Sequence, residues 1–147
     1  MYKRILVATD GSELSGKALD HAIALAKVHG AELVALKVTQ LQVEGHWDGQ
    51  IQGDAAEKAE QEKRRADLSR AVVDGVKASA QAAGVVATAV TERSNFIADT
   101  VIEVAMKREC DLIVMASHGR RGLARVLLGS ETQHVLTHST VPVLVLR

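Results

Sequence analysis

Short apolar runs alternate along the chain with longer segments in which apolar residues recur at helical spacing. Runs rich in Val, Ile and Leu cover residues 4–8, 32–39, 112–116 and 141–146, and a weaker run covers residues 85–91. Their length and composition predict five β-strands. The runs at 4–8 and 112–116 are apolar at nearly every position, as in strands covered on both faces. We therefore expect these two strands to be central in the sheet.

Two helices are predicted in the first half of the chain. The first ends before Gly30 and turns an apolar face inward, made of Leu14, Ala18, Ala22, Leu25 and Val28. The second spans about residues 55–83 and ends before Gly84, with an inward face of Leu68, Ala71, Val72, Val76, Ala80 and Ala83. The charged run at residues 58–70 is then its solvated face. Residues 40–53 lack periodicity and indicate a long mobile loop, suited to a lid or a partner surface.

Two further helices are predicted in the second half. One covers about residues 96–108, is capped by Ser94 or Asn95, and turns Val101, Val104 and Ala105 inward. The other begins at Ser130, where Ser130 and Gln133 match a capping box, and ends near His138.

The strict alternation of strand and helix indicates an α/β fold. Parallel neighbours need right-handed helical crossovers, so the order predicts a three-layer sandwich around a five-stranded, mostly parallel sheet. The 147 residues fit a single domain, residues 1–147. In such sheets ligands bind beyond the carboxyl ends of the strands, where the strand order reverses. The segments to inspect therefore follow the strands at 4–8 and 112–116.

Composition and charge narrow the classes of partner. The chain is 47% hydrophobic and 24% charged, and its 18 basic residues balance 18 acidic ones. No overall field therefore attracts nucleic acid or an anionic membrane. The lone Cys110 cannot close a disulfide within the chain, and neither a signal-peptide pattern nor a membrane-length apolar run is seen. We expect a soluble cytoplasmic protein with a buried or inert Cys110, and a ligand that is bound by a local site rather than by overall charge.

The segment that follows residues 112–116 has the composition of an anion-binding loop. Gly119, Gly122 and Gly129 allow close backbone approach, and the helix predicted at Ser130 offers first-turn amides and a favourable dipole. Arg120, Arg121 and Arg125 add donors suited to phosphate oxygens. The alternative is a loop of turn glycines with Ser130 as a simple helix cap.

Residues 115–130 closely resemble the signature of universal stress proteins: Gly, two residues, Gly, nine residues, then Gly-Ser or Gly-Thr. Residues 1–12 and 112–146 also resemble that family's opening and closing segments. The resemblance implies a Rossmann-like fold of the adenine nucleotide alpha hydrolase type. It also implies a stress-response regulatory protein that binds ATP, with Mg2+ on the phosphates, and whose main task is not catalysis.

The resemblance further implies which residues surround the nucleotide. Adenine and ribose would contact Ala8, Thr9, Asp10 and Val38, while ribose and phosphates would lie near Met115, Ala116, Gly119, Gly129, Ser130 and the Glu131 amide. The neighbouring Ser117, His118, Arg120, Gly122 and Thr132 complete the predicted nucleotide site. Asp10 and Ser12 have an alternative role, in which they shape the turn and cap the first helix.

One position departs from the signature, because its first glycine is Ala116 here. The methyl group is tolerable if the backbone φ is negative and costly if φ is positive. Two alternatives therefore stay open: a dimeric adaptor that has lost ATP binding, and a slow ATPase.

The sequence does not indicate a P-loop, a dinucleotide site, a catalytic nucleophile or a metal site. The chain lacks a P-loop, and the glycines after residue 8 do not form Gly-x-Gly-x-x-Gly. Ser117 and His118 are adjacent, which does not align a nucleophile with a base. His134 and His138 have helical metal-pair spacing without the Glu of His-Glu-x-x-His, so no metal site and no catalytic residue are predicted.

The last apolar run predicts a homodimer. Residues 143–146 are apolar on both faces, and an exposed edge strand of this kind invites pairing. A two-fold partner would pair the edge with its own copy. The resemblance implies the same interface, with a further regulatory partner protein that the residues do not identify. The alternative is a monomer whose last strand is covered by the final helix.

Overall fold

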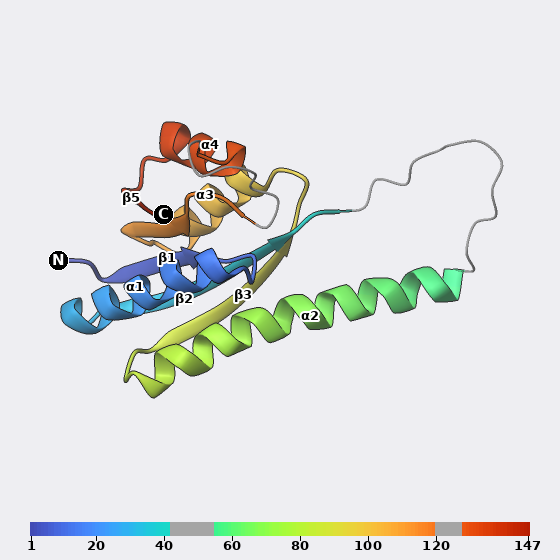
Figure 1. Cartoon of the computed structure of the whole chain (residues 1–147), viewed down its shortest axis with the longest axis horizontal. Coiled ribbons are helices and arrows are strands. Elements are labelled where there is room, and N and C mark those ends of the chain that lie inside the picture. Colours follow the sequence, from blue (N-terminus) through green and yellow to red (C-terminus); the bar gives the residue numbers. More distant parts are fainter. Residues whose placement is uncertain (42–54, 120–127) are drawn as a thin grey trace.

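The computed structural model describes residues 1–41, 55–119 and 128–147, which form a parallel sheet between two helical layers (Figure 1). The strands are β1 (Arg4–Ala8), β2 (Glu32–Thr39), β3 (Ala87–Arg93), β4 (Leu112–Ala116) and β5 (Val143–Leu146). The helices are α1 (Glu13–His29), α2 (Ala55–Ala82), α3 (Ile97–Lys107) and α4 (Ser130–His138). The predicted α/β order is confirmed element by element.

The five strands lie in the order β3-β2-β1-β4-β5, and all four neighbouring pairs are parallel. The chain winds outward from β1 to β3, then returns to the other side of β1 for β4 and β5. The strand order therefore reverses between β1 and β4, and β1 is the central strand. The carboxyl ends of these two strands form the switch point at which ligands bind in doubly wound sheets.

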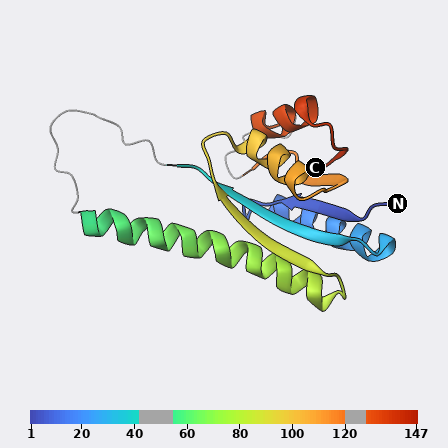
Figure 2. The same cartoon turned by 180° about the vertical axis from the view of Figure 1, so that it is seen from behind.

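The sheet has a separate apolar core on each face, because side chains alternate along every strand. Ile5, Val7 and Val114 face α1 and α2, whereas Leu6, Ile113 and Met115 face α3 and α4. Figure 2 shows the same layers from behind, with α2 lying along β3 and β2. Two covered faces explain why β4 and residues 5–8 of β1 are apolar.

Strand ends differ from prediction in two places. β3 begins two residues later than expected and extends to Arg93, because its last residues pair with the end of β2. Val85 is buried outside the strand, with its amide bonded to Ala80 O. β5 begins at Val143, and the carbonyl of Pro142 already accepts from Ile113 N.

The inward faces of α1 and α2 were partly mispredicted. In α1 the buried residues are Ser15, Ala18, Ala22 and Ala26, whereas Val28 is 80% exposed. In α2 they are Ser69, Val73, Val76 and Ala80, whereas Leu68 is 68% exposed. Small residues make up the inward face of α1. In α2 a polar serine is buried where it has a partner, since Ser69 Oγ lies 2.8 Å from Thr39 Oγ1.

The N-terminal half of α2 runs past the end of the sheet (Figure 1). Every residue from 55 to 68 is exposed, as expected for a solvated helical face. The bond of 2.8 Å from Arg93 Nη2 to Glu62 Oε1 ties this half to β3, and the Arg93 guanidinium lowers the pKa of the Glu62 carboxyl. Most of the predicted loop at 40–53 lies outside the described residues.

Both caps predicted for the last two helices are wrong. Gly129, not Ser130, is the N-cap of α4, and no capping-box bond joins Ser130 to Gln133, whose amide bonds to Gly129 O. The N-cap of α3 is Phe96, without a side-chain cap of its own. Ser94 Oγ accepts from Phe96 N, just outside the helix, and the carboxylate of Glu131 on α4 accepts from Ala98 N.

Among the described helices, none combines the length and hydropathy that a membrane span requires. Cys110 precedes β4 and is buried, as expected, and burial raises the pKa of its thiol to about 11.

Candidate functional site

The loops that follow β1 and β4 meet at the switch point. A Cβ built on Gly119 would lie 2.7 Å from Asp10 Oδ2, closer than real Cβ contacts allow. The absence of a side chain at Gly119 therefore lets the backbone after β4 pass directly beside the Asp10 carboxylate. Two segments more than 100 residues apart in sequence form one surface, as predicted from the strand order.

The β1 loop is held by its own side chains. Asp10 Oδ1 accepts from Ser12 N at 2.9 Å, and Ser12 Oγ accepts from Ser15 N at 3.2 Å as the N-cap of α1. Gly11 has φ 80, which favours glycine in this turn. The structural role considered for Asp10 and Ser12 is thus observed, while Asp10 Oδ2 still faces the β4 loop.

The start of α4 lies against the end of β4. Gly129 N donates to Ser117 O at 2.7 Å, and a Cβ on Gly129 would be only 3.3 Å from both Ser117 O and His118 Cα. The buried Thr132 Oγ1 donates to Ala116 O at 3.0 Å. Ser130 and Glu131 are exposed in the first turn, whose amides lack acceptors within the helix itself. This is a glycine-flanked helix N-terminus aimed at the carboxyl end of the sheet.

Ala116 occupies the position of the first glycine in the signature without backbone strain. It is the last residue of β4, is 8% exposed, and pairs with Leu146 of β5. Among the described residues, Glu109 is the non-glycine residue with positive φ, so Ala116 has negative φ. The condition under which its methyl group is tolerated is therefore met.

The residues expected near the base share one side of the sheet. Ala8, Val38 and Met115 all pack against the core on the α3 and α4 face. Thr9, next to Ala8, continues the pairing with β2 through a bond from its amide to Leu36 O. The ends of β1, β2 and β4 thus provide an apolar patch beside the polar loops.

Ser117 and His118 make a local contact. Ser117 is 4% exposed, and its Oγ lies 3.1 Å from His118 Nδ1. The contact is a local turn bond, and the buried Ser117 hydroxyl is not presented to a substrate as a nucleophile would be. Arg120 and Gly122, together with Arg121 and Arg125, lie outside the described residues.

Sequence reasoning missed Lys37 and the side-chain contact of Glu131, whose amide alone was predicted at the site. Lys37 Nζ donates to Asp10 O at 3.1 Å and brings a positive charge to the β1 loop. The side chain of Glu131 turns away from the site to bond α3. Lys37 directly precedes Val38, a predicted site residue on β2, and this position could have identified it. Nothing in the sequence indicated that the Glu131 side chain would bond to α3.

The α3 and α4 face carries a separate polar cluster. His134 Nε2 lies 2.8 Å from Asp99 Oδ1, and the rings of His134 and His138 stack with centroids 4.1 Å apart. A hollow of about 410 Å³ lies beside them, lined by residues that include Phe96, Asp99 and His138. Within the described part of the chain, no three His, Cys, Asp or Glu side chains are grouped to hold a metal.

The family model and the similar proteins of known family all belong to one family. The model of the universal stress protein family matches residues 1–147. Universal stress protein MJ0531 of Methanocaldococcus jannaschii is 35% identical over 154 residues, covering 100% of this chain and 83% of the relative. Universal stress protein YxiE of Bacillus subtilis is 30% identical over 159 residues, with 100% of both chains covered.

Solved structures agree with the fold. The structure of MJ0577, described as a structure-based assignment of biochemical function, has a TM-score of 0.81 at 27% identity and covers 99% of this chain and 96% of its own. A universal stress protein in complex with cAMP has a TM-score of 0.72 at 27% identity, covering 99% and 97%.

Proposed function

The chain belongs to the universal stress protein family, and on that premise we propose that it binds ATP or a related adenine nucleotide at the switch point of its sheet. The observation that carries the proposal is the pair of close approaches at Gly119 and Gly129. The backbone at Gly119 lies beside the Asp10 side chain, and the backbone at Gly129 lies beside residues 117 and 118, where α4 begins at the carboxyl end of the sheet. Backbone amides at a helix N-terminus favour a phosphate group.

The surrounding residues suit the other parts of such a ligand. The Asp10 carboxylate accepts hydrogen bonds of the kind that ribose hydroxyls donate, and Val38 offers apolar contact to a base. Ser130 adds an exposed hydroxyl beside the first-turn amides. The relative in complex with cAMP supports an adenine nucleotide as the ligand class.

ATP is a suitable ligand for these amides and hydroxyls. Mg2+ would be bound by the phosphates of the nucleotide. Bound nucleotide would supply negative charge and a rigid base at the switch point, while this chain's residues bind and orient it. We propose a regulatory output in the response to stress, in which occupancy alters the binding of a protein partner in the cytoplasm. Catalysis is not required for that role.

Titration of the purified protein with ATP, cAMP, AMP and GTP by isothermal calorimetry tests the proposal. Saturable binding of adenine nucleotides in preference to GTP is expected. Absence of binding by ATP and by cAMP at millimolar concentration would contradict it and favour the adaptor without nucleotide. Release of phosphate above an enzyme-free control would instead favour the slow ATPase.

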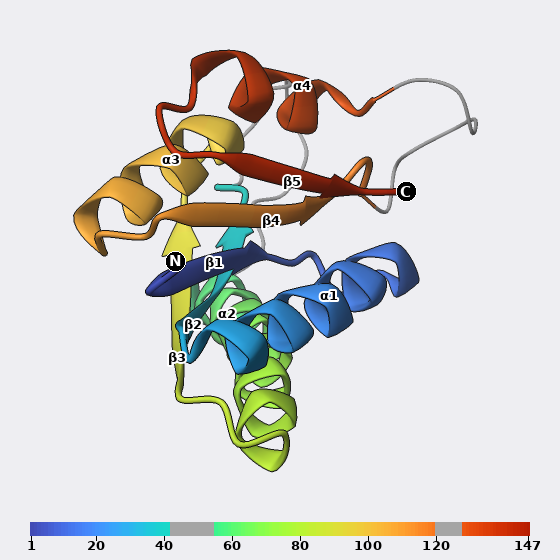
Figure 3. The same ribbon diagram turned by 90° about the vertical axis from the view of Figure 1, so that its left-hand side faces the viewer.

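A homodimer through β5 is part of the same proposal. β5 is an edge strand of the described sheet, next to β4 (Figure 3), and all four of its residues are half-buried. Val143 and Val145 pack toward α3 and α4, and Leu144 and Leu146 toward α1. An apolar edge with both faces only partly covered favours pairing with a second copy across a two-fold axis.

A further inference from the structure

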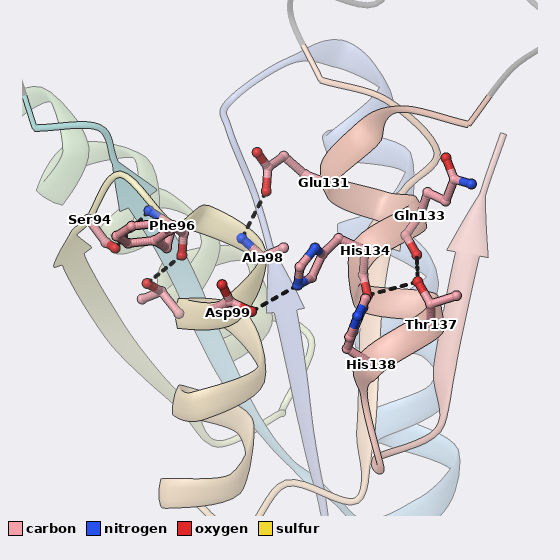
Figure 4. A network of polar contacts seen from close by, with 10 residues as sticks. Ser94, Phe96, Ala98, Asp99, Glu131, Gln133, His134, Thr137 and His138 are labelled. Atoms are coloured by element: carbon pink, nitrogen blue, oxygen red, sulfur yellow. Dashed lines mark hydrogen bonds and ion pairs between the residues drawn. The ribbon is translucent and has the colours of Figure 1, made fainter.

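Glu131 uses its backbone and its side chain in opposite directions. Its amide belongs to the first turn of α4, at the proposed phosphate site. Its carboxylate points to the neighbouring helix α3, where Glu131 Oε2 accepts from Ala98 N at 2.9 Å (Figure 4). One exposed residue thus joins the candidate site to a second element.

The partner of this bond is an open helix end. The N-cap of α3, Phe96, provides no side-chain acceptor, and the first-turn amides of a helix have none within it. Ala98 is 4% exposed, so its amide has little access to water. A carboxylate at this position both satisfies the amide and interacts favourably with the helix dipole.

The first turn of α4 is otherwise held from the β4 side. Gly129 N bonds to Ser117 O and Thr132 Oγ1 bonds to Ala116 O. We infer that the Glu131 side chain is a positioning residue, which ties the other side of this turn to α3 and links occupancy of the nucleotide site to the start of α3. The inference rests on the proposed function, because it concerns the regulation of that same site.

The bond also keeps a negative charge away from the ligand. Glu131 lies in the turn that would face phosphate, where a free carboxylate would repel it. Because its oxygen is bonded to α3, the carboxylate is directed away while the amide remains in the first turn. Loss of the bond would therefore loosen the first turn of α4 and would also free the Glu131 carboxylate to approach the phosphate.

Comparison of Glu131→Gln with Glu131→Ala separates the bond from the charge. Both changes remove the negative charge, but only glutamine keeps a side-chain oxygen that can accept from Ala98 N. We expect Glu131→Gln to bind ATP at least as tightly as the wild type. Glu131→Ala is expected to bind about three- to tenfold more weakly than Glu131→Gln, the effect of one hydrogen bond. Equal affinities of the two variants would overturn the inference.

Asp99→Ala is the matched control. It breaks another polar contact between α3 and α4, the one to His134, which lies one turn farther along α4. ATP affinity within twofold of the wild type is expected. A loss as large as that of Glu131→Ala would show that any contact between the two helices suffices and would overturn the assignment to Glu131.

Amide exchange distinguishes this inference from the proposed function. In the ligand-free protein, Glu131→Ala should speed exchange of the Gln133 amide, which bonds to Gly129 O, and Glu131→Gln should not. ATP should slow exchange at Ala98 in the wild type and lose that effect in Glu131→Ala. If the wild type binds no ATP, the proposed function fails, and equal Gln133 exchange in the two variants overturns the positioning role independently.

Discussion

At the scale of single residues, Gly129 is a position where added volume meets backbone directly. A Cβ there would lie 3.3 Å from Ser117 O and His118 Cα, so alanine must displace the loop after β4 or the start of α4. We expect Gly129→Ala to weaken ATP binding about tenfold or more, since displaced amides no longer face the phosphate. Calorimetric titration measures the effect.

Gly75 provides the same substitution without the contact. It lies within α2, is exposed, and a Cβ there meets nothing within 4 Å. Gly75→Ala should leave ATP affinity unchanged and raise the free energy of unfolding by roughly 0.5–1 kcal/mol, because alanine favours the helix. Equal losses of ATP affinity in the two variants would count against the site.

Ala116 separates the requirements of folding from those of binding. Its methyl group is buried at the end of β4, and its φ requires no glycine. Ala116→Gly should lower the free energy of unfolding by about 1 kcal/mol in a urea titration. ATP affinity should be held or raised if the methyl group restricts the ligand, and a marked loss would show that it makes a favourable contact.

Cys110 should react slowly in the folded protein. Burial raises the pKa of its thiol to about 11, so the reactive thiolate is scarce at pH 8. The folded state prefers the protonated thiol, so this contribution to stability is complete below the thiol's ordinary pKa and is lost as pH rises toward 11. Iodoacetamide labelling at pH 8 should be slow in buffer and fast in urea; equal rates would contradict the burial argument.

At the scale of elements, the end of α3 carries a residue with unfavourable backbone geometry. Glu109 follows the helix with φ 55, and the next amide, Cys110 N, closes the turn on Ala105 O. Glycine is preferred at this left-handed position after a helix. Glu109→Gly should raise the free energy of unfolding by about 1 kcal/mol, measured by urea denaturation.

The same substitution inside α3 should have the opposite sign. Glu103 is exposed within the helix, so Glu103→Gly should lower the free energy of unfolding by about 1 kcal/mol. Loss of the 3.8 Å contact between Glu109 and Arg4 costs little, because the Glu109 side chain is 88% exposed. A destabilised Glu109→Gly protein would mean that this contact outweighs the backbone gain.

At the scale of the whole molecule, the two sheet edges should differ in their tolerance of charge. Val143 and Val145 lie on edge strand β5, half-buried and apolar. Replacing both with lysine should give a monomer or insoluble protein, whereas light scattering of the wild type at micromolar concentration should give twice the chain mass. A wild-type mass of one chain would contradict the dimer. Thr88→Lys on the opposite edge strand β3, where Thr88 is exposed, should leave the dimer intact.

The sequence by itself determined the order of the elements and pointed to the loops in which the candidate site lies. Continuous apolar runs such as residues 5–8 and 112–116 favour burial on both faces, and alternation with helices then favours parallel crossovers. Ligands bind such sheets where the strand order reverses, which we expected at the two central strands, and the structure has the reversal between β1 and β4. The glycines after β4 indicated a binding loop, because the backbone can approach another group closely only where no side chain intervenes.

Only the tertiary structure decided which face of each helix is buried and how its ends are satisfied. Leu68 was expected on the inward face of α2 and is 68% exposed, whereas the neighbouring Ser69 is buried against Thr39 of β2. The start of α3 is capped by Glu131, 33 residues away, rather than by the nearby Ser94. Capping patterns describe local partners, whereas a buried amide is satisfied by whichever acceptor the packing brings within reach.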